Sequence, residues 1–158
     1  MYGDRDNTIA SCYGIVRLVS RAAINNGTAM LGSEAVTEGI RIKVVSRYSE
    51  EHSRPDEDHW FFLYHITITN EGRQTVKLLR RHWTITDARG MTQVVDGQGV
   101  VGEQPILEPG QSFQYTSACP LVTEVGSMQG YYTLRDENGD EFHANIAPFT
   151  LSQATVLH

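Results

Sequence analysis

The sequence predicts an all-β fold, an antiparallel β-sandwich, and three observations lead to this prediction. Apolar and polar residues alternate from Ala35 onward, which is the period of strands with one buried face. Turn signals interrupt the alternation about every 8–12 residues, and no helical pattern falls between the strands. The strand at residues 60–69 lacks the cysteine of antibody domains. We therefore predict an Ig-like or fibronectin type III-like sandwich held by apolar packing.

The first predicted strand carries Ile40, Ile42 and Val44 on one face, followed by a polar loop at residues 49–59. The alternation is strongest at residues 60–69, the second predicted strand. Its predicted inner face is formed by Phe62, Tyr64, Ile66 and Ile68.

Turn residues at 70–73 separate this strand from the next, which we expect at residues 75–87. The apolar parity of that strand slips between Leu78 and Leu79, which predicts a bulge or bend. Trp83 is expected in the core.

Shorter elements follow. A turn at residues 87–90 leads to a strand at 91–95, and residues 108–111 have the proline and glycine that a type II turn requires. Another strand is expected at 113–116, and residues 120–130 are predicted to be an irregular crossing segment.

The C-terminal part predicts a hairpin. Strands at residues 131–135 and 141–146 flank Asn138-Gly139, which is a strong hairpin signal. The last strand is expected to continue past Pro148 to Leu151.

Length and charge limit the function classes. A chain of 158 residues suits one domain, and no apolar run reaches the roughly 20 residues of a membrane span. The net charge of −6 argues against nucleic-acid binding. Cys12 and Cys119 form no framework, so we expect a reducing compartment and a structural role for Cys119.

Residues 1–33 are predicted to form an N-terminal extension, and residues 34–158 the sandwich domain. The extension has no acid after Asp6, and four of its apolar residues share one helical face: Ile15, Leu18, Val19 and Ala22. Three interpretations stay open: an organellar presequence, a loosely attached tail, or sequence upstream of a start at Met30. The predicted location is cytoplasmic, or organellar if the extension is a presequence.

Gly97, Gly99 and Gly102 keep the spacing of a dinucleotide-binding loop. Pro105 and the turn at residues 108–111 leave no room for the helix that such a loop needs, so we predict a loop between strands. It is either an anion-binding nest of backbone N–H groups or a structural bend that packs two valines under the sandwich end.

Arg80 and Arg81 are the only adjacent basic pair and the one candidate phosphate clamp. They are equally compatible with strand residues on opposite faces. Asp96 and Glu103 flank the glycine loop with negative charge, which favours the structural interpretation.

Metal and catalytic sites are not predicted. The loop at residues 49–59 holds five carboxylates and two histidines, but in no EF-hand or zinc-type spacing, which favours a solvated acidic loop. His65 and His82 lie within strands and are interpreted as structural. No nucleophile or metalloprotease motif occurs, so we expect no enzyme activity and no cofactor.

Several motifs together resemble the ApaG domain over about residues 36–158. They are GIRI (39–42), FLYHITITN (62–70), LRRHW (79–83), GQGVVGEQP (97–105), LEPG (107–110), YTS (115–117) and GSMQG (126–130). The resemblance implies a fibronectin type III-like sandwich. It also implies relatives that are free-standing bacterial proteins or domains of eukaryotic F-box and polymerase-associated adaptors. The bacterial proteins are linked by name to cobalt resistance and magnesium efflux.

The function expected from the residues and the resemblance is that of a non-enzymatic binding or adaptor module with a protein partner. The alternative is a small-ligand sensor for a phosphate- or nucleotide-containing anion, or for a divalent cation. No nucleic acid or membrane partner is expected, and free sandwich edges leave a homo-oligomer open.

Overall fold

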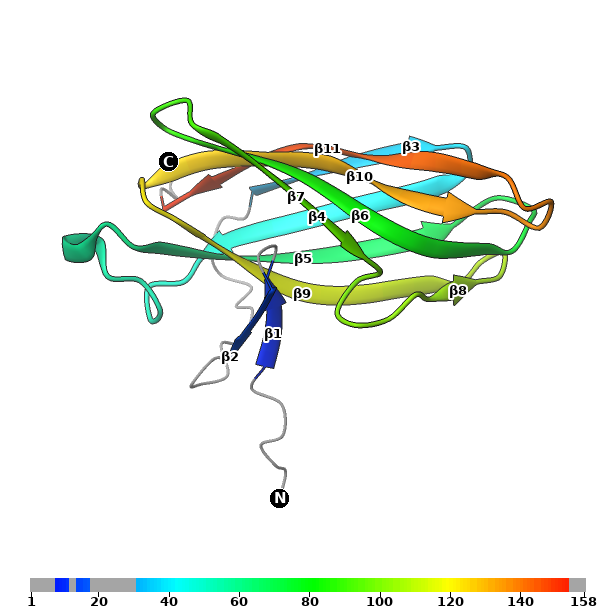
Figure 1. The fold of residues 1–158 in the computed structure, drawn as a ribbon, viewed down its shortest axis with the longest axis horizontal. Coiled ribbons are helices and arrows are strands. Elements are labelled where there is room, and N and C mark those ends of the chain that lie inside the picture. The colour runs from blue at the N-terminus through cyan, green and yellow to red at the C-terminus, as the bar shows by residue number, and fades with distance from the viewer. Residues whose placement is uncertain (1–7, 12–13, 18–30, 154–158) are drawn as a thin grey trace, which may run out of the picture.

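The computed structural model of the protein describes residues 8–11, 14–17 and 31–153, which form two β-sheets packed face to face (Figure 1). The first sheet has the order β2-β1-β9-β5-β4-β3. Its strands are β1 (Thr8–Ser11), β2 (Gly14–Arg17), β3 (Leu31–Thr37), β4 (Ile40–Tyr48), β5 (Trp60–Asn70) and β9 (Ser112–Leu121). All neighbours are antiparallel except β1 and β9, which are parallel.

The second sheet has the order β11-β10-β6-β7, and the short strand β8 also pairs with β6. Its strands are β6 (Val76–Asp87), β7 (Thr92–Gln98), β8 (Ile106–Leu107), β10 (Val125–Arg135) and β11 (Glu141–Ser152). One 3-10 helix, η1 (Pro55–Glu57), lies in the loop between β4 and β5. No helix within the described ranges is long and apolar enough to cross a membrane. The predicted β-sandwich is confirmed.

The core fills the space between the two sheets and follows the predicted alternation. The predicted inner face of β5 is buried along its whole length, and so is Trp83 of β6. The indole ring of Trp83 makes edge contacts with Tyr64, Tyr132 and Phe149, with ring centroids 5.4, 6.4 and 6.0 Å away. Aromatic residues from both sheets thus meet at the centre of the sandwich.

The predicted bulge in β6 is confirmed. Thr133 of β10 pairs with Arg80, while the next residue of β10, Leu134, pairs with Leu78, so Leu79 is the extra residue. Both Leu78 and Leu79 are buried. The bulge therefore allows two consecutive apolar residues of one strand to be buried.

The predicted irregular segment at residues 120–130 is wrong, because β9 continues through Leu121 and β10 begins at Val125. The glycines that suggested irregularity serve close strand packing instead. A Cβ on Gly130 would lie 1.9 Å from the carbonyl oxygen of His82, and one on Gly126 would lie 2.7 Å from that of Thr86. Glycine is required there because neighbouring backbone leaves no room for a side chain.

The structure describes one residue of the helical face considered for the extension, Ile15, and this residue is not helical. Ile15 lies in β2, which pairs antiparallel with β1, and Ile15 and the following valine are residue types that favour strands. The other members of that face, Leu18, Val19 and Ala22, lie outside the described residues. In addition, β3 begins at Leu31, ahead of the predicted domain start.

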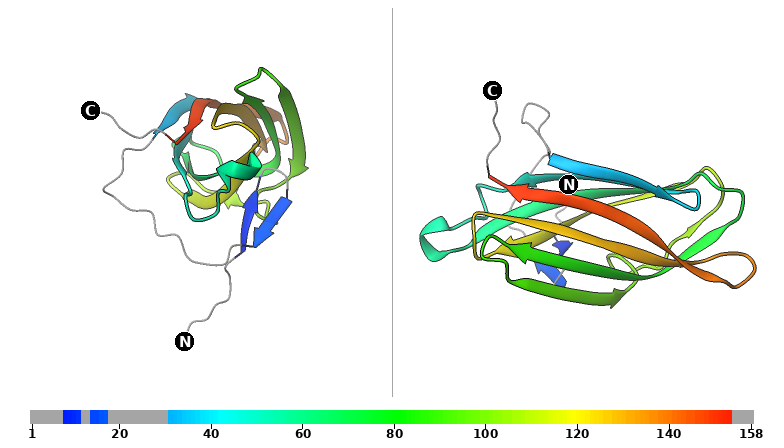
Figure 2. Two further views of the ribbon diagram at one scale, coloured as in Figure 1. Left: turned by 90° about the vertical axis from the view of Figure 1, so that its left-hand side faces the viewer. Right: turned by 90° about the horizontal axis from the view of Figure 1, so that it is seen from above.

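The two lateral edges of the sandwich differ. At one edge β3 lies beside β11, as both views of Figure 2 show, and side chains bond across the seam. The Ser33 hydroxyl donates to the backbone carbonyl of Ala147 (2.7 Å), and the Ser46 hydroxyl donates to the backbone carbonyl of Thr150 (3.0 Å). On the opposite side β7 and β9 are not paired with each other, and β9 pairs instead with β1 at Ser117 and Ala118. One seam is therefore closed and the other is open.

Candidate functional site

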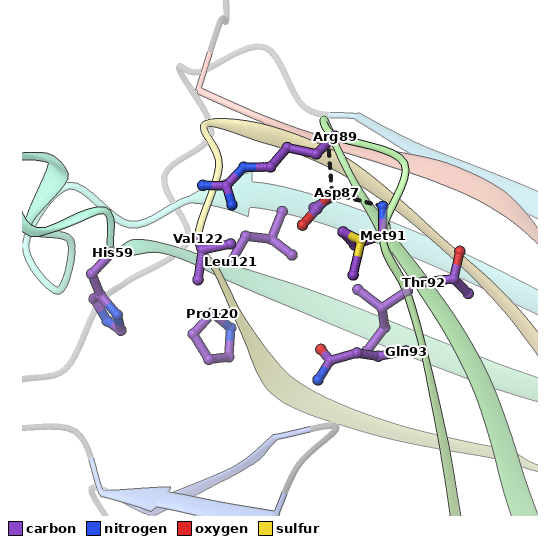
Figure 3. A pocket seen from close by; sticks show the side chains of 10 residues that line it. His59, Asp87, Arg89, Met91, Thr92, Gln93, Pro120, Leu121 and Val122 are labelled. Atoms are coloured by element: carbon purple, nitrogen blue, oxygen red, sulfur yellow. Dashed lines mark hydrogen bonds between the residues drawn. The ribbon is translucent and has the colours of Figure 1, made fainter.

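A groove of about 540 Å³ lies at the open seam, between β7 and the C-terminal end of β9 (Figure 3). Its wall on the five-stranded sheet comes from β6, β7 and the turn between them. Its other wall comes from the end of β9 and from His59. The lining residues are His59, Ile85, Asp87, Arg89, Met91, Thr92, Gln93, Pro120, Leu121 and Val122.

Apolar side chains dominate this groove and remain open to solvent. Met91 is 65% exposed and Val122 is 51% exposed, whereas Ile85 and Leu121 form a buried floor. Large apolar residues exposed on both lips of one groove are unusual for a surface that faces only water. The arrangement suits the burial of an apolar side chain from a ligand or partner.

The lip formed by the β6–β7 turn is held rigidly by Asp87. Its carboxylate accepts hydrogen bonds from the backbone N–H groups of Arg89 (2.8 Å) and Met91 (3.0 Å), drawn as dashed lines in Figure 3. The Asp87 N–H in turn donates to the Met91 carbonyl at 3.0 Å. This closed turn fixes the position from which Met91 projects.

The strand beside the groove is an edge strand. Among the described strands, β7 pairs with β6 alone, and Val94 in its middle is 58% exposed. A sheet edge presents backbone donors and acceptors to which an extended chain can add. Groove and edge therefore run side by side.

Negative charge is concentrated at the same end of the molecule. The loop at residues 49–59 ends at His59, which lines the groove, and the five carboxylates of this loop are exposed. Arg54 is the basic residue of that loop. Within the described ranges no group of three or more His, Cys, Asp or Glu side chains is placed to hold a metal ion.

The glycine loop lies at the other end of β7 and, as predicted, opens no helix. Gly97 belongs to β7, and a Cβ there would lie 2.6 Å from the guanidinium carbon of Arg81. Arg81 Nη1 donates to the carbonyl oxygens of Gln98 and Gly99, both at 2.9 Å. The structure thus brings Arg81 together with two of the predicted glycines, where it binds backbone carbonyls.

Much of the loop's backbone donor capacity is used internally. The Gly99 N–H donates to the Leu79 carbonyl, and Val100 and Glu103 exchange N–H and carbonyl bonds, all at 2.8 Å. Val100 is fully buried, and Val101, which has a positive φ of 43°, packs against the core. These contacts favour the structural interpretation of the loop, and the anion-binding alternative stays a prediction.

Arg80 is not part of this arrangement. It is exposed, and its Nη2 lies 2.9 Å from the Glu141 carboxylate on the far side of the sheet. The outer face there also carries His82, whose Nδ1 is 2.6 Å from the Asp96 carboxylate and whose ring stacks on Tyr131 at 4.7 Å. The two arginines therefore project to opposite faces and do not form a common clamp.

Sequence reasoning missed the groove. Its residues come from three separate stretches, around residue 59, at 85–93 and at 120–122. One signal was present: the apolar stretch at residues 119–122 breaks the alternation where a solvent-facing residue is expected. The acidic loop was identified, but not its position beside an apolar surface.

Known proteins resemble this chain over most of its length. The ApaG domain family model matches residues 50–136. Protein ApaG of Methylobacterium sp. (strain 4-46) is 52% identical over 118 residues, covering 75% of this chain and 91% of that protein. Protein ApaG of Azoarcus sp. (strain BH72) is 48% identical over 126 residues, covering 80% and 99%. The crystal structure of the putative ApaA protein from Bordetella pertussis is 44% identical, with a TM-score of 0.70 over 72% of this chain and 92% of that chain.

Proposed function

This chain belongs to the ApaG domain family, and we propose that it is a non-enzymatic binding module that engages a protein partner at the open seam between β7 and β9. The observation that supports this most is the asymmetry of the sandwich. One seam is bridged by serine side chains of β3 and β4 that bond to β11, whereas the other holds an apolar groove beside an edge strand. Burying such surface is the main favourable term in association.

The partner segment is an extended peptide that lies along β7. Its backbone adds to the edge of the sheet, and alternate side chains enter the groove between Met91 and Val122. This mode needs no conformational change of the rigid β6–β7 turn held by Asp87. Backbone pairing supplies affinity, and the groove selects apolar side chains.

The charge of the partner follows from the surroundings. Asp87 and Arg89 balance each other in the groove lining, five exposed carboxylates lie in the loop that ends at His59 of the groove, and the whole chain carries a net charge of −6. Complementary charge increases the association rate and excludes partners of like charge. We therefore expect a segment with alternating apolar residues flanked by lysine or arginine.

A display selection of extended peptides against the full chain tests this proposal. Enriched peptides should combine alternating apolar residues with basic flanks, and their affinity should fall as salt concentration rises. Met91→Glu and Val122→Glu should each weaken binding at least tenfold, because they place a charge on a lip of the groove.

The matched control is Val36→Glu. Val36 is also an exposed valine (48%), but it lies on β3 at the closed seam, so its substitution should leave binding unchanged. Equal binding by wild type and both groove variants would refute the assignment of the surface. Enrichment of acidic peptides would refute the proposed chemistry of the partner.

A further inference from the structure

A second polar cluster lies on the outer face of the six-stranded sheet, where β4 ends. Arg47 of β4 pairs with Leu63 of β5, and it alternates with core residues such as Ser46, so its side chain projects outward. Two residues later the Ser49 N–H donates to the Phe61 carbonyl at 2.8 Å. The ring of His52 lies 5.4 Å from that of Phe61, and its Nδ1 is 2.8 Å from the Ser49 hydroxyl.

Three polar atoms of this cluster are buried without a hydrogen-bond partner: Nε and Nη2 of Arg47, and Nε2 of His52. Among the described residues, no other side-chain nitrogen or oxygen atom is buried without a hydrogen-bond partner. Buried donors in native proteins are nearly always paired, because an unpaired donor loses its hydration and gains nothing. Three such atoms in one corner indicate acceptors that come from elsewhere.

The geometry of the unpaired atoms specifies the missing group. Nε and Nη2 form one edge of the guanidinium, and their two parallel N–H bonds match the two oxygens of a carboxylate. At His52, Nδ1 accepts a hydrogen bond from the Ser49 hydroxyl in the tautomer that leaves Nε2 protonated as a further donor. In that tautomer the cluster offers donors only.

Arg41 shows what a satisfied arginine on the same strand and face looks like. Its Nε and Nη1 lie 2.7 Å from the carboxylates of Glu71 and Glu34, and these bonds raise its pKa. Burial instead lowers the pKa of Arg47, and the attraction of the Glu51 carboxylate offsets this only in part. Arg47 is therefore a cation without the partner that its neighbour has.

We propose that Arg47, assisted by His52, binds a carboxylate ligand at this corner of the sheet. The two carboxylate oxygens accept the Nε and Nη2 hydrogens of Arg47, and one of them also accepts the Nε2 hydrogen of His52. A singly charged carboxylate fits better than a doubly charged phosphate, because Glu51 is close and the chain is acidic overall. Phe61 and Leu63, both buried on this face, keep the site dry.

The side-chain N–H signals of arginine in ¹⁵N-labelled full-length protein test the proposal directly. Titration with acetate, at constant ionic strength balanced with chloride, should shift the Arg47 Nε–Hε signal saturably and leave that of Arg41 in place. The Nε–Hε signal that is missing from the spectrum of Arg47→Lys belongs to Arg47. The same substitution should also abolish the rise in melting temperature that acetate gives the wild type. His52→Gln should weaken the acetate affinity several-fold.

Two further arms complete the test. A peptide with a free C-terminal carboxylate, compared with its C-terminal amide and with acetate, distinguishes a peptide ligand from a small carboxylic acid. Absence of saturation, or an equal shift at Arg41, would overturn the proposal. It would also be overturned if Glu51→Gln alone reproduced the stability loss of Arg47→Lys in the absence of acetate, since Glu51 would then be the partner.

Discussion

At the scale of single residues, the centre of the sandwich depends on a few aromatic side chains that are closed off from water. Trp83 and Tyr132 are fully buried, and the Tyr132 hydroxyl is hydrogen-bonded to that of Tyr115 on the opposite sheet. Trp83 therefore contributes mainly volume to the core, whereas Tyr132 joins the two sheets through a polar contact.

Trp83→Ala should be among the most damaging single substitutions. Truncation of a fully buried tryptophan costs about 3–5 kcal/mol, because transfer free energy is lost and a cavity remains. Urea unfolding followed by circular dichroism measures this loss, and Trp83→Phe serves as the milder control. Near-native stability of Trp83→Ala would place the side chain on the surface and contradict the packing described above.

Tyr132 should make the free energy of unfolding fall as the pH rises above 10. Burial, together with the neighbouring Tyr115, raises the pKa of Tyr132 well above its ordinary value of 10.0. Below pH 10 the tyrosine is protonated in both the folded and the unfolded chain. Above pH 10 only the unfolded chain releases the proton, so stability should fall by up to about 1.4 kcal/mol per pH unit until the pH passes the raised pKa.

Denaturant unfolding at pH 9, 10 and 11 measures this slope. Tyr132→Phe should reduce it, because phenylalanine has no proton to release. Tyr131→Phe is the matched control, since Tyr131 projects from the opposite face of the same strand and is only half-buried. An unchanged slope in Tyr132→Phe would contradict the pKa shift.

At the scale of elements, the glycine loop illustrates how two glycines of one motif differ in role. Gly99 has a φ of 61°, and a Cβ there would lie 2.2 Å from the Glu103 carbonyl oxygen. Gly102 has a φ of 80°, but no atom lies within 4 Å of its hypothetical Cβ. The first glycine provides both backbone conformation and close approach, and the second provides conformation alone.

Gly99→Ala should therefore destabilise the protein more than Gly102→Ala does. We expect about 1 kcal/mol for Gly102→Ala, from the positive φ, and clearly more for Gly99→Ala because its Cβ collides with backbone. Thermal unfolding with and without ATP measures both effects, and ATP should not raise the melting temperature of the wild type. A rise with ATP that disappears in the alanine variants would instead support the anion-binding alternative.

At the scale of the whole molecule, the sandwich is complete from β3 to β11. β3 pairs with β4 over its full length and bonds to β11 across the closed seam. By contrast, β1 joins the sandwich through two register pairs with β9, Ala10 with Ser117 and Ser11 with Ala118. The described strands of the extension thus add little pairing to the two sheets.

Deletion of residues 1–30 should leave the fold intact. The melting temperature is expected to change by no more than about 4 °C, which corresponds to roughly 1 kcal/mol in a domain of this size. Deletion of residues 1–38, which also removes β3, should lower it far more, because the closed seam is then lost. A large drop for the shorter deletion would show that the extension packs onto the sandwich.

The sequence by itself determined the local geometry of this protein. The alternation in β5, the extra residue at Leu79 and the Asn138-Gly139 turn were all readable, because the strand period and turn chemistry depend on near neighbours in the chain. The strand course at residues 120–130 was not readable. Gly126 and Gly130 have no local signal that distinguishes close strand packing from a loop.

Only the tertiary structure decided which edges of the sandwich close and which stay open. Sequence alternation assigns a residue to a face of its strand, but the seam between two sheets depends on how they twist and pack on each other. For this reason Met91 and Val122, far apart in sequence, form the lips of one groove. The opposite directions of Arg80 and Arg81, by contrast, follow from strand alternation alone. The unpaired edge of Arg47, like the groove, is a property of the assembled surface, because nothing near it in sequence distinguishes it from the fully paired Arg41.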